Sequence, residues 1–449
     1  MTLDLKKYIN SYRDSSPLAV FRILFGVLMF FSIVRFWYNG WIETVYIEPL
    51  LHFKYYGFEW VKSLNEWNYL LFALCAVTSI LIAIGYKYKI SIILFFLSFT
   101  YIELIDKTTY LNHYYFVSII SFILIFVPAN CKFSVDSFRN KIEYEKVPIW
   151  TIDVIKVMLF IVYFYAGLAK INSDWLIRAM PLSIWLPGKY DLPIIGFLMD
   201  QKWVAYAMSW CGMLYDLLIG FFLFSKKYRN VAFLFVVIFH LMTAIFFPSI
   251  GMFPYIMITS TIIFLNQKVH LNIIKYLKKI FFVKTNNKIL STYNTKNISV
   301  YILSVLLLIQ ILFPLRCLLY SGELFWNEEG YRFSWRVMLM EKAGHTTFTV
   351  IDKNSDKRIM VQNDKFLTTF QEKQMSFQPD MILEYAHFLG DFYKKKGFAK
   401  PSVFADSYVT LNKRISTRFI EKDFDLLSTK NSFLKKKWII PIKDEIKGF

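Results

Sequence analysis

A single lysine, Lys170, ends an otherwise apolar segment, IVYFYAGLAKINSDW, and is the residue of this chain best suited to chemistry. A charge close to hydrocarbon is costly, so an ionisable residue there favours a functional interpretation. Apolar surroundings also disfavour the charged ammonium form of a lysine. We therefore predict that Lys170 presents a neutral amine, which can accept a proton as a general base.

The helical face that carries Lys170 also holds Tyr163, Ala166 and Gly167, because positions 163, 166, 167 and 170 share one side of a helix. Small residues on that face let another helix approach closely, or leave a slot for a flat ligand. Two alternatives stay open. Lys170 could extend to the membrane interface, or it could pair with Asp174 one turn later.

A polar connection between two apolar runs, LIDKTTYLNHYYF, contains His113 and its neighbour Asn112. A count of membrane spans places this connection and Lys170 on the same side of the membrane. His113 is then a candidate to work together with Lys170. The alternative is an ordinary solvated loop, since loops are generally polar.

Two ionisable residues lie inside apolar spans, His240 in VVIFHLMTAIF and Asp216 in WCGMLYDLLIG. A lone membrane histidine is more often an interhelical hydrogen-bonding group than a catalyst. A membrane carboxylate requires a partner or a proton, and the sequence names no partner for Asp216. The tight connection 247–255, FPSIGMFPY, is predicted to line a pocket near the outer interface.

A second mixed segment, YRFSWR, follows the last apolar run and contains Tyr331, Ser334, Trp335 and Arg336. Aromatic rings, a hydroxyl and a guanidinium suit an extended peptide that bears a carboxylate. The alternative is a strand whose aromatic residues fill the junction with the membrane. The cysteines show no metal-ligand spacing, so we predict no metal site.

The composition is that of a membrane protein, with 56% hydrophobic and only 19% charged residues. Soluble domains carry about 25% charged residues. The net charge of +19 does not indicate nucleic acid, because many Lys and Arg residues lie in short connections between apolar runs. Nine runs could span a membrane; they lie near 18–37, 68–85, 89–105, 114–130, 152–170, 203–224, 230–247, 252–266 and 298–319.

The distribution of positive charge predicts the orientation. With a cytoplasmic N-terminus, 19 Lys and Arg residues fall in cytoplasmic connections and six on the other side. An odd number of spans then sends the C-terminal region to the outer face. From about residue 320 the apolar runs stop, and a hairpin around 353–356, an amphipathic helix ending at Gly397 and a further strand are expected.

The predicted fold class is therefore a membrane all-α bundle of about nine transmembrane helices with a C-terminal extramembrane α+β domain. We assign residues 1–320 to the bundle, which would be catalytic, and residues 321–449 to the domain on the outer face. The N-terminal run has no cleavage-site pattern, so it is interpreted as an uncleaved span. The Lys-, Ile- and Asn-rich usage suggests a microbe, and hence a bacterial inner membrane.

Taken together, these motifs resemble the vitamin K-dependent gamma-carboxylase family, including its microbial members with the horizontally transferred transmembrane domain. The resemblance rests on several segments in the same order along the chain: SPLAVFRILFGVLMF, LIDKTTYLNHYYF, IVYFYAGLAKINSDW, FHLMTAIFFPSIGMFPY, YRFSWRVM and PSVFADSYVTLNKR.

The resemblance implies a reduced vitamin K, a hydroquinone, as cofactor, with O2 and CO2 as co-substrates and no metal. Lys170 would deprotonate the hydroquinone, oxygenation would generate a strong base, and a peptide glutamate would be carboxylated while the cofactor leaves as its epoxide. His113 would assist carbanion formation. Asn112, Tyr163, Gly167 and His240 would contact the cofactor. Tyr331, Ser334, Trp335 and Arg336 would bind the glutamate.

The implied partners are membrane lipid, a prenylated quinol and a glutamate-containing peptide or protein. There are departures from the family pattern: Ala169 stands where animal members carry a second lysine, and Met340 replaces a histidine common in them. Met340 keeps open a quinol epoxidase that does not carboxylate protein. A non-enzymatic transporter or scaffold is the third alternative; transporters often contain internal repeats, and the sequence displays no evident one.

Overall fold

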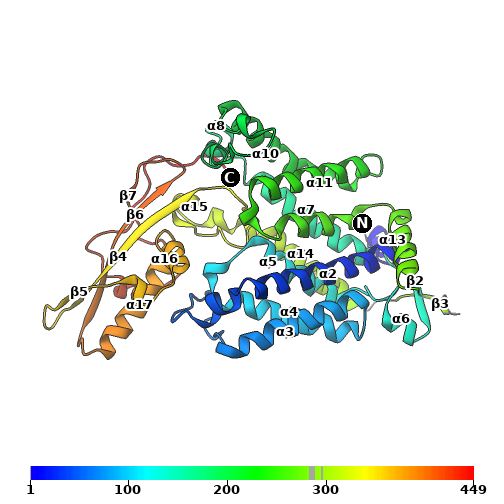
Figure 1. The fold of residues 1–449 in the computed structure, drawn as a ribbon, viewed down its shortest axis with the longest axis horizontal. Helices are drawn as coiled ribbons and strands as arrows, with labels where there is room; N and C mark the ends of the chain where they lie inside the picture. The colour runs from blue at the N-terminus through cyan, green and yellow to red at the C-terminus, as the bar shows by residue number, and fades with distance from the viewer. Residues whose placement is uncertain (1, 283–288, 295–296) are drawn as a thin grey trace.

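The computed structural model describes residues 2–282, 289–294 and 297–449. These residues form an elongated helical bundle with a small α+β domain at one end (Figure 1). The predicted fold class, a helical membrane bundle followed by a C-terminal α+β region, is confirmed.

Within the described residues, seven helices are long and apolar enough to cross a membrane. They are α2 (Ser16–Tyr38), α3 (Asn68–Ile84), α4 (Tyr88–Ile105), α7 (Trp150–Leu168), α10 (Lys202–Phe224), α11 (Arg229–Phe246) and α14 (Asn297–Leu312). Adjoining 3-10 turns extend α3 back to Asn65 and α14 on to Leu319. Two shorter apolar helices, α5 (Asn112–Phe126) and α12 (Phe253–Thr261), occupy the places of the other two predicted spans.

A buried arginine in α2 connects several helices by hydrogen bonds at the end of the bundle that is remote from the α+β domain. The Arg22 guanidinium donates hydrogen bonds to the carbonyl oxygens of Ile82, Ala83, Ala129 and Phe133 at 2.5–3.0 Å. A buried charge is costly unless its donors are satisfied, so these four carbonyls explain how Arg22 is tolerated. Arg22 thereby links α2 to the end of α3 and to the residues after α5.

Short elements cover this end of the bundle: α1 (Thr2–Ile9), β1 (Tyr12–Asp14), α6 (Val135–Arg139), β2 (Ile142–Pro148), α13 (Gln267–Ile280) and β3 (Ile289–Thr292). The strand order is β1-β2-β3, with β1 antiparallel and β3 parallel to β2. Lys284, Lys288 and Lys296, which contribute to the predicted charge asymmetry, lie outside the described residues. The orientation in the membrane stays a prediction.

The α+β domain at the other end is built on an antiparallel sheet of order β5-β4-β6-β7. Its elements are α15 (Leu324–Asn327), β4 (Lys342–Asp352), β5 (Arg358–Met360), α16 (Thr369–Met375), α17 (Pro379–Lys395), β6 (Pro401–Leu411) and β7 (Thr417–Arg418). The predicted hairpin is confirmed, since Thr349 pairs with Met360. The predicted amphipathic helix is α17, and it stops just before Gly397, whose φ is +98°.

The core of this domain continues into the bundle. Trp326 and Leu339 belong to the same buried cluster as Ala169 and Trp175, which flank Lys170. Two short helices, α8 (Ser173–Ile177) and α9 (Leu182–Trp185), follow α7 at this junction. Figure 1 shows α8 and the C-terminal end of the chain together at this corner. The α+β domain therefore packs directly against the turn that carries Lys170.

Candidate active site

Helices α7 and α10 approach each other closely at Gly167. A Cβ atom at this position would lie 2.4 Å from the backbone nitrogen of Leu217 on α10. The prediction that small residues on this face of α7 admit a neighbouring helix is thus confirmed. The close approach places Asp216 next to Lys170, one turn beyond the glycine.

Lys170 lies at the exit of α7 with its side chain only 7% exposed. Its Nζ donates hydrogen bonds to Asp216 Oδ2 at 2.7 Å and to the Ala166 carbonyl oxygen at 3.2 Å. The amine also lies 5.2 Å from the ring centroid of Trp175, within cation–π range. Asp216 is buried as well, so the partner that the sequence could not name is Lys170.

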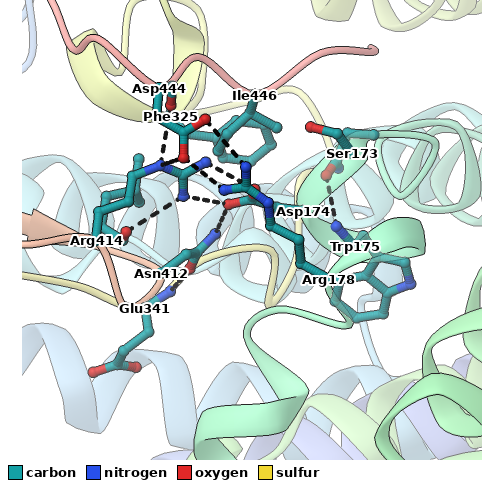
Figure 2. Close-up of polar contacts among 12 residues, drawn as sticks. Ser173, Asp174, Trp175, Arg178, Phe325, Glu341, Asn412, Arg414, Asp444 and Ile446 are labelled. Atoms are coloured by element: carbon teal, nitrogen blue, oxygen red, sulfur yellow. Dashed lines mark hydrogen bonds and ion pairs between the residues drawn. The ribbon is translucent and has the colours of Figure 1, made fainter.

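The alternative partner, Asp174, is engaged elsewhere (Figure 2). Its carboxylate accepts two hydrogen bonds from Arg414, at 2.7 and 2.9 Å, and one from Asn412 at 2.7 Å. Asp444 joins the cluster by accepting from Arg178 at 2.6 Å. The hydrogen bond from Arg178 lowers the pKa of the Asp444 carboxyl. Asp174 thus attaches α8 to the α+β domain and leaves Lys170 free to face another carboxylate.

The segment Ile446–Phe449 holds the Lys170 turn from the other side. Asn172 and Gly448 form an antiparallel bridge, the Ser173 amide donates to the Lys447 carbonyl at 2.7 Å, and the Phe449 amide donates to the Ile171 carbonyl at 3.0 Å. Backbone hydrogen bonds of this kind fix the turn in one conformation. The position of the amine is therefore set by the bundle and the domain together.

Lys170 and Asp216 line a cavity of about 640 Å³ between α7, α10, α11 and α12. Most of the wall is apolar or aromatic, and it includes Ala166, Trp175, Trp185, Leu214, Leu218, Phe222, Phe235, Ile238, Phe239, Phe247, Phe253, Val337 and Met338. Several of these residues on α10 and α11 are exposed on the outside of the bundle, where lipid would contact them. The cavity is large enough for a small ligand. The predicted contribution of 247–255 is confirmed by Phe247 and Phe253.

His240 and Tyr163 form the second polar group of the cavity wall. The Tyr163 hydroxyl lies 3.0 Å from His240 Nε2 and 3.4 Å from Thr261 Oγ1. The other ring nitrogen of His240, Nδ1, is buried without a hydrogen-bond partner in the described part of the chain. A buried polar atom of this kind is unusual.

His113 and Asn112 do not line the cavity. The His113 ring is buried in the first turn of α5, and its centroid lies 6.0 Å from that of Phe253. Phe253 also packs 5.5 Å from His240 and is itself part of the cavity wall, so it stands next to both histidines. The Asn112 amide donates to the Arg336 carbonyl at 2.7 Å, which joins α5 to the α+β domain.

The side chains of the 331–336 segment also point elsewhere. Ser334 donates to the Tyr331 carbonyl, and Trp335 is stacked on Tyr115 with ring centroids 4.9 Å apart. The Arg336 guanidinium donates to the main-chain oxygen of Phe449 at 3.1 Å. None of these four residues lines the cavity. The next two residues, Val337 and Met338, do.

Gly167 acts through the backbone, since its position against α10 leaves it out of the cavity wall. The structure thus brings together Lys170, Tyr163 and His240 of the predicted residues, and it adds Asp216, Val337 and Met338. The cost of a carboxylate in a membrane helix was the available signal for Asp216. Val337 and Met338 carry no chemical signal of their own.

Comparison with known proteins gives two family matches. Residues 10–268 match the family model of the HTTM domain, and residues 295–445 match that of the vitamin K-dependent gamma-carboxylase, lumenal domain. No solved structure matches the chain. The first match contains Lys170 and the whole of α7, α10 and α11, and the second contains α14 and the sheet of the α+β domain.

Proposed function

Because the chain belongs to the vitamin K-dependent gamma-carboxylase family, we propose that it oxygenates a reduced vitamin K-type quinone and uses that reaction to carboxylate peptide glutamate. The observation that carries the proposal is the position of Lys170. Its amine is the one lysine nitrogen that lines the apolar cavity in the part of the chain that the structure describes. A buried amine in a water-poor pocket suits the removal of a proton from a ligand hydroxyl.

The cavity fits a reduced quinone in size and chemistry. Flat aromatic walls at Trp175, Tyr215 and Phe253 suit a ring system, and the polar groups are few and lie at Lys170, Asp216, Tyr163 and His240. A prenyl tail would extend between α10 and α11 toward lipid, along the apolar residues of the cavity wall that are exposed there. When bound, the reduced quinone would supply all four electrons that reduce O2, two as the hydroquinone is oxidised and two as its ring is epoxidised; the replacement of the glutamate carbon–hydrogen bond needs no oxidant.

The overall reaction is balanced. One oxygen atom of O2 enters the epoxide and the other leaves as water, with two hydrogens equivalent to those of the hydroquinone hydroxyl groups. The γ carbon–hydrogen bond of glutamate is replaced by a carbon–carbon bond to CO2, and one proton is released. The protein's part is to accept the first proton at Lys170 Nζ and to exclude water from the cavity. It also has to bring glutamate near the ring, and Val337 and Met338 mark the side of the cavity that the α+β domain reaches.

His113 is proposed to act through the Phe253 side of the cavity. Its ring lies behind Phe253, so a rearrangement of that phenylalanine would bring His113 to the ligand. Asn112 is proposed to hold the 331–336 segment, which would bind the glutamate, in a fixed position against α5 through its hydrogen bond to the Arg336 carbonyl. The C-terminal domain would then lie on the outer face of the membrane, as the family description of a lumenal domain suggests.

A second candidate is a quinol epoxidase that does not carboxylate protein. The observation in its favour is that, within the described residues, the cavity wall contains no arginine and no lysine besides Lys170 to bind a glutamate carboxylate. Arg336, the predicted carboxylate ligand, contacts Phe449 instead.

The test is a product assay on the purified full chain in lipid nanodiscs. The protein is given reduced vitamin K, O2, isotopically labelled CO2 and a glutamate peptide, and both the epoxide and the label in the peptide are measured. We expect both products from the wild type and neither from Lys170→Ala. The matched control is Lys156→Met, which removes a buried lysine from the same helix α7 at Asp153, outside the cavity.

Each outcome separates the candidates. Epoxide without label in the peptide favours the epoxidase. Full turnover by Lys170→Ala refutes the role of the lysine, and a wild type that neither binds nor oxidises the quinol refutes both candidates. Equal losses in Lys170→Ala and Lys156→Met would indicate a damaged bundle instead of a missing base, and would also count against the assignment.

A further inference from the structure

The Lys170–Asp216 contact is an isolated ion pair inside an apolar cavity. Nζ and Oδ2 lie 2.7 Å apart, and both side chains are less than 10% exposed. Both residues line the cavity. In the part of the chain that the structure describes, the cavity wall contains no further Asp, Glu, Lys or Arg, and its other titratable groups are His240, Tyr163, Tyr215, Tyr228 and Cys211.

This arrangement conflicts with a base made of lysine alone. In an ion pair the lysine is an ammonium, which has no free electron pair to accept a proton. If the lysine were neutral beside an ionised Asp216, one negative charge would remain unpaired in an apolar cavity, which is strongly unfavourable. The pair therefore has zero net charge before the reaction, whichever of the two residues carries the shared proton.

We infer that the proton acceptor is the Lys170–Asp216 pair and that the proton finally resides on Asp216; the inference rests on the proposed function. The O–H bond of the bound hydroxyl group breaks, its electron pair stays on oxygen, and its proton binds to Lys170 Nζ. One Nζ proton moves to Asp216 Oδ2 across the 2.7 Å contact. No atom is oxidised or reduced in this step.

The end state is the same from either starting form. A neutral amine beside a protonated carboxyl also yields an ammonium beside a protonated carboxyl once the amine accepts the proton. The pair then carries one positive charge, directed at the ligand oxygen that has become negative. The cavity as a whole stays neutral, which a low-dielectric site favours. Asp216 thereby lets a lysine in an ion pair serve as a base.

The inference is tested without turnover, using reduced menaquinone added to the full chain in nanodiscs in the absence of O2. Ultraviolet absorbance reports whether the bound hydroxyl group is ionised. Infrared spectra of protein labelled with carbon-13 at the aspartate carboxyls report which aspartates are protonated. We expect the bound state to show an ionised ligand together with a protonated aspartate whose band is absent from Asp216→Asn. An ionised ligand with no protonated aspartate in the wild type would overturn the inference.

Variants provide a second measurement. Asp216→Asn keeps the shape and removes the acceptor, and we expect the bound hydroxyl group to be ionised at least tenfold less at neutral pH than in the wild type. Asp216→Glu restores a carboxylate and should recover part of the ionisation. The matched control is Glu103→Gln, which removes another carboxylate from a membrane helix, α4, outside the cavity. It should leave the ionisation unchanged.

The outcomes distinguish this inference from the proposed function. Ionisation in Asp216→Asn equal to or above that of the wild type shows that lysine alone is the base, and overturns the inference while the proposed function stands. If the wild type does not bind reduced menaquinone, both fall. If Asp216→Asn does not fold, the labelled aspartate band of the wild type decides by itself.

Discussion

Two buried lysines lie at the junction between the bundle and the α+β domain, and their surroundings differ. Lys107, in the connection before α5, lies 3.0 Å from Asp380 and 2.8 Å from Glu384, and Asp380 also accepts a hydrogen bond from Arg332 at 2.8 Å. Lys170 has one carboxylate, Asp216, and borders a cavity. Both nitrogens are buried and both are paired.

The comparison shows that burial and ion pairing alone do not identify a base. At Lys107 a network of opposite charges surrounds the amine, which does not line the cavity described above, so the interaction holds α17 of the domain against the bundle. At Lys170 the amine is paired with a single carboxylate, and it borders the cavity. The available space and the count of neighbouring charges distinguish the two sites.

The largest expected effect comes from replacing Lys170 by arginine. Lys170→Arg keeps a cation beside Asp216 but cannot supply a neutral amine, because arginine stays protonated in proteins. Loss of a general base typically costs about 10²–10⁴-fold in rate, and we expect a loss of that size in epoxide formation. Lys107→Arg is the matched control and should keep turnover within a few-fold. Equal losses at both positions would remove the distinction.

Removal of charge at Lys107 should instead affect stability. Lys107→Met leaves Glu384, whose side chain is 27% exposed, without the Lys107 cation, while Asp380 keeps Arg332. Breaking a fully buried pair from one side costs about 3–5 kcal/mol; the partly exposed Glu384 lowers the expected cost to about 2–3 kcal/mol, which thermal unfolding followed by tryptophan fluorescence would measure. Lys353→Met, at the exposed Lys353–Asp425 pair, is the control and should cost about 0–1 kcal/mol. If the two costs were equal, Lys107 would not be a structural centre.

A change in the packing of α7 on α10 should affect the Lys170 site and leave the Lys107 site unchanged. Gly167→Ala forces a Cβ into the space of Leu217 N, 2.4 Å away, so the helices must separate. Overpacking of this kind costs about 1–3 kcal/mol. We also expect lower turnover, since Asp216 would move away from Lys170. Gly212→Ala on α10 is the control for stability alone, because its Cβ would lie 3.8 Å from Trp175, an ordinary contact, but Gly212 lines the cavity. A stable, active Gly167→Ala protein would contradict this account.

The fold class could be predicted from sequence because the apolar runs are long and the connections between them are polar. The limits of α5 were less predictable, since its polar first turn, Asn112 and His113, is part of the helix and its last turn stops at Phe126 instead of residue 130. The sheet β1-β2-β3 was not predicted. It joins short segments far apart in the chain, none of which alternates long enough to indicate a strand.

The candidate site was predictable where a residue is chemically out of place in its segment. Lys170 and His240 are of this kind, and both line the cavity. The pairing of Lys170 with Asp216 was not predictable, because the two residues are 46 positions apart and meet only where α7 packs against α10. The buried contacts of Arg336 depend on Cys317 and Phe449, to which no local pattern in YRFSWR points.

Acid should weaken the Lys107 site in a defined direction. Although burial opposes it, the charges of Arg332 and Lys107 hold the pKa of Asp380 well below its usual range. A carboxyl whose pKa is lower in the folded protein adds stability above its unfolded pKa of about 3.9 and loses that contribution as the pH falls toward the folded value. Wild type should therefore exceed Asp380→Asn in stability near pH 6, by about 1–3 kcal/mol, and the difference should shrink below pH 4.

The difference between the two proteins reduces the contribution of the neighbouring Glu384, whose pKa is raised by burial and, less, by the Asp380 charge. Glu384 titrates in both proteins and acts in the opposite direction. Unfolding curves collected from pH 6 down to pH 3 would measure the effect. A gap between wild type and Asp380→Asn that widens as the pH falls would contradict the assigned direction.

The smallest expected effect concerns the second polar group of the cavity wall, Tyr163 and His240. Tyr163→Phe removes the hydroxyl that lies 3.0 Å from His240 Nε2, a hydrogen bond between α7 and α11. Such interhelical bonds in membrane proteins average about 0.6 kcal/mol, so unfolding should shift only slightly. The control is Tyr228→Phe, which removes another tyrosine hydroxyl from the cavity wall. A loss of reduced-menaquinone binding in Tyr163→Phe as large as the loss of turnover in Lys170→Arg would contradict this expectation. The ligand would then depend on Tyr163 and His240. The contrast between Lys107 and Lys170 would no longer explain where the chemistry occurs.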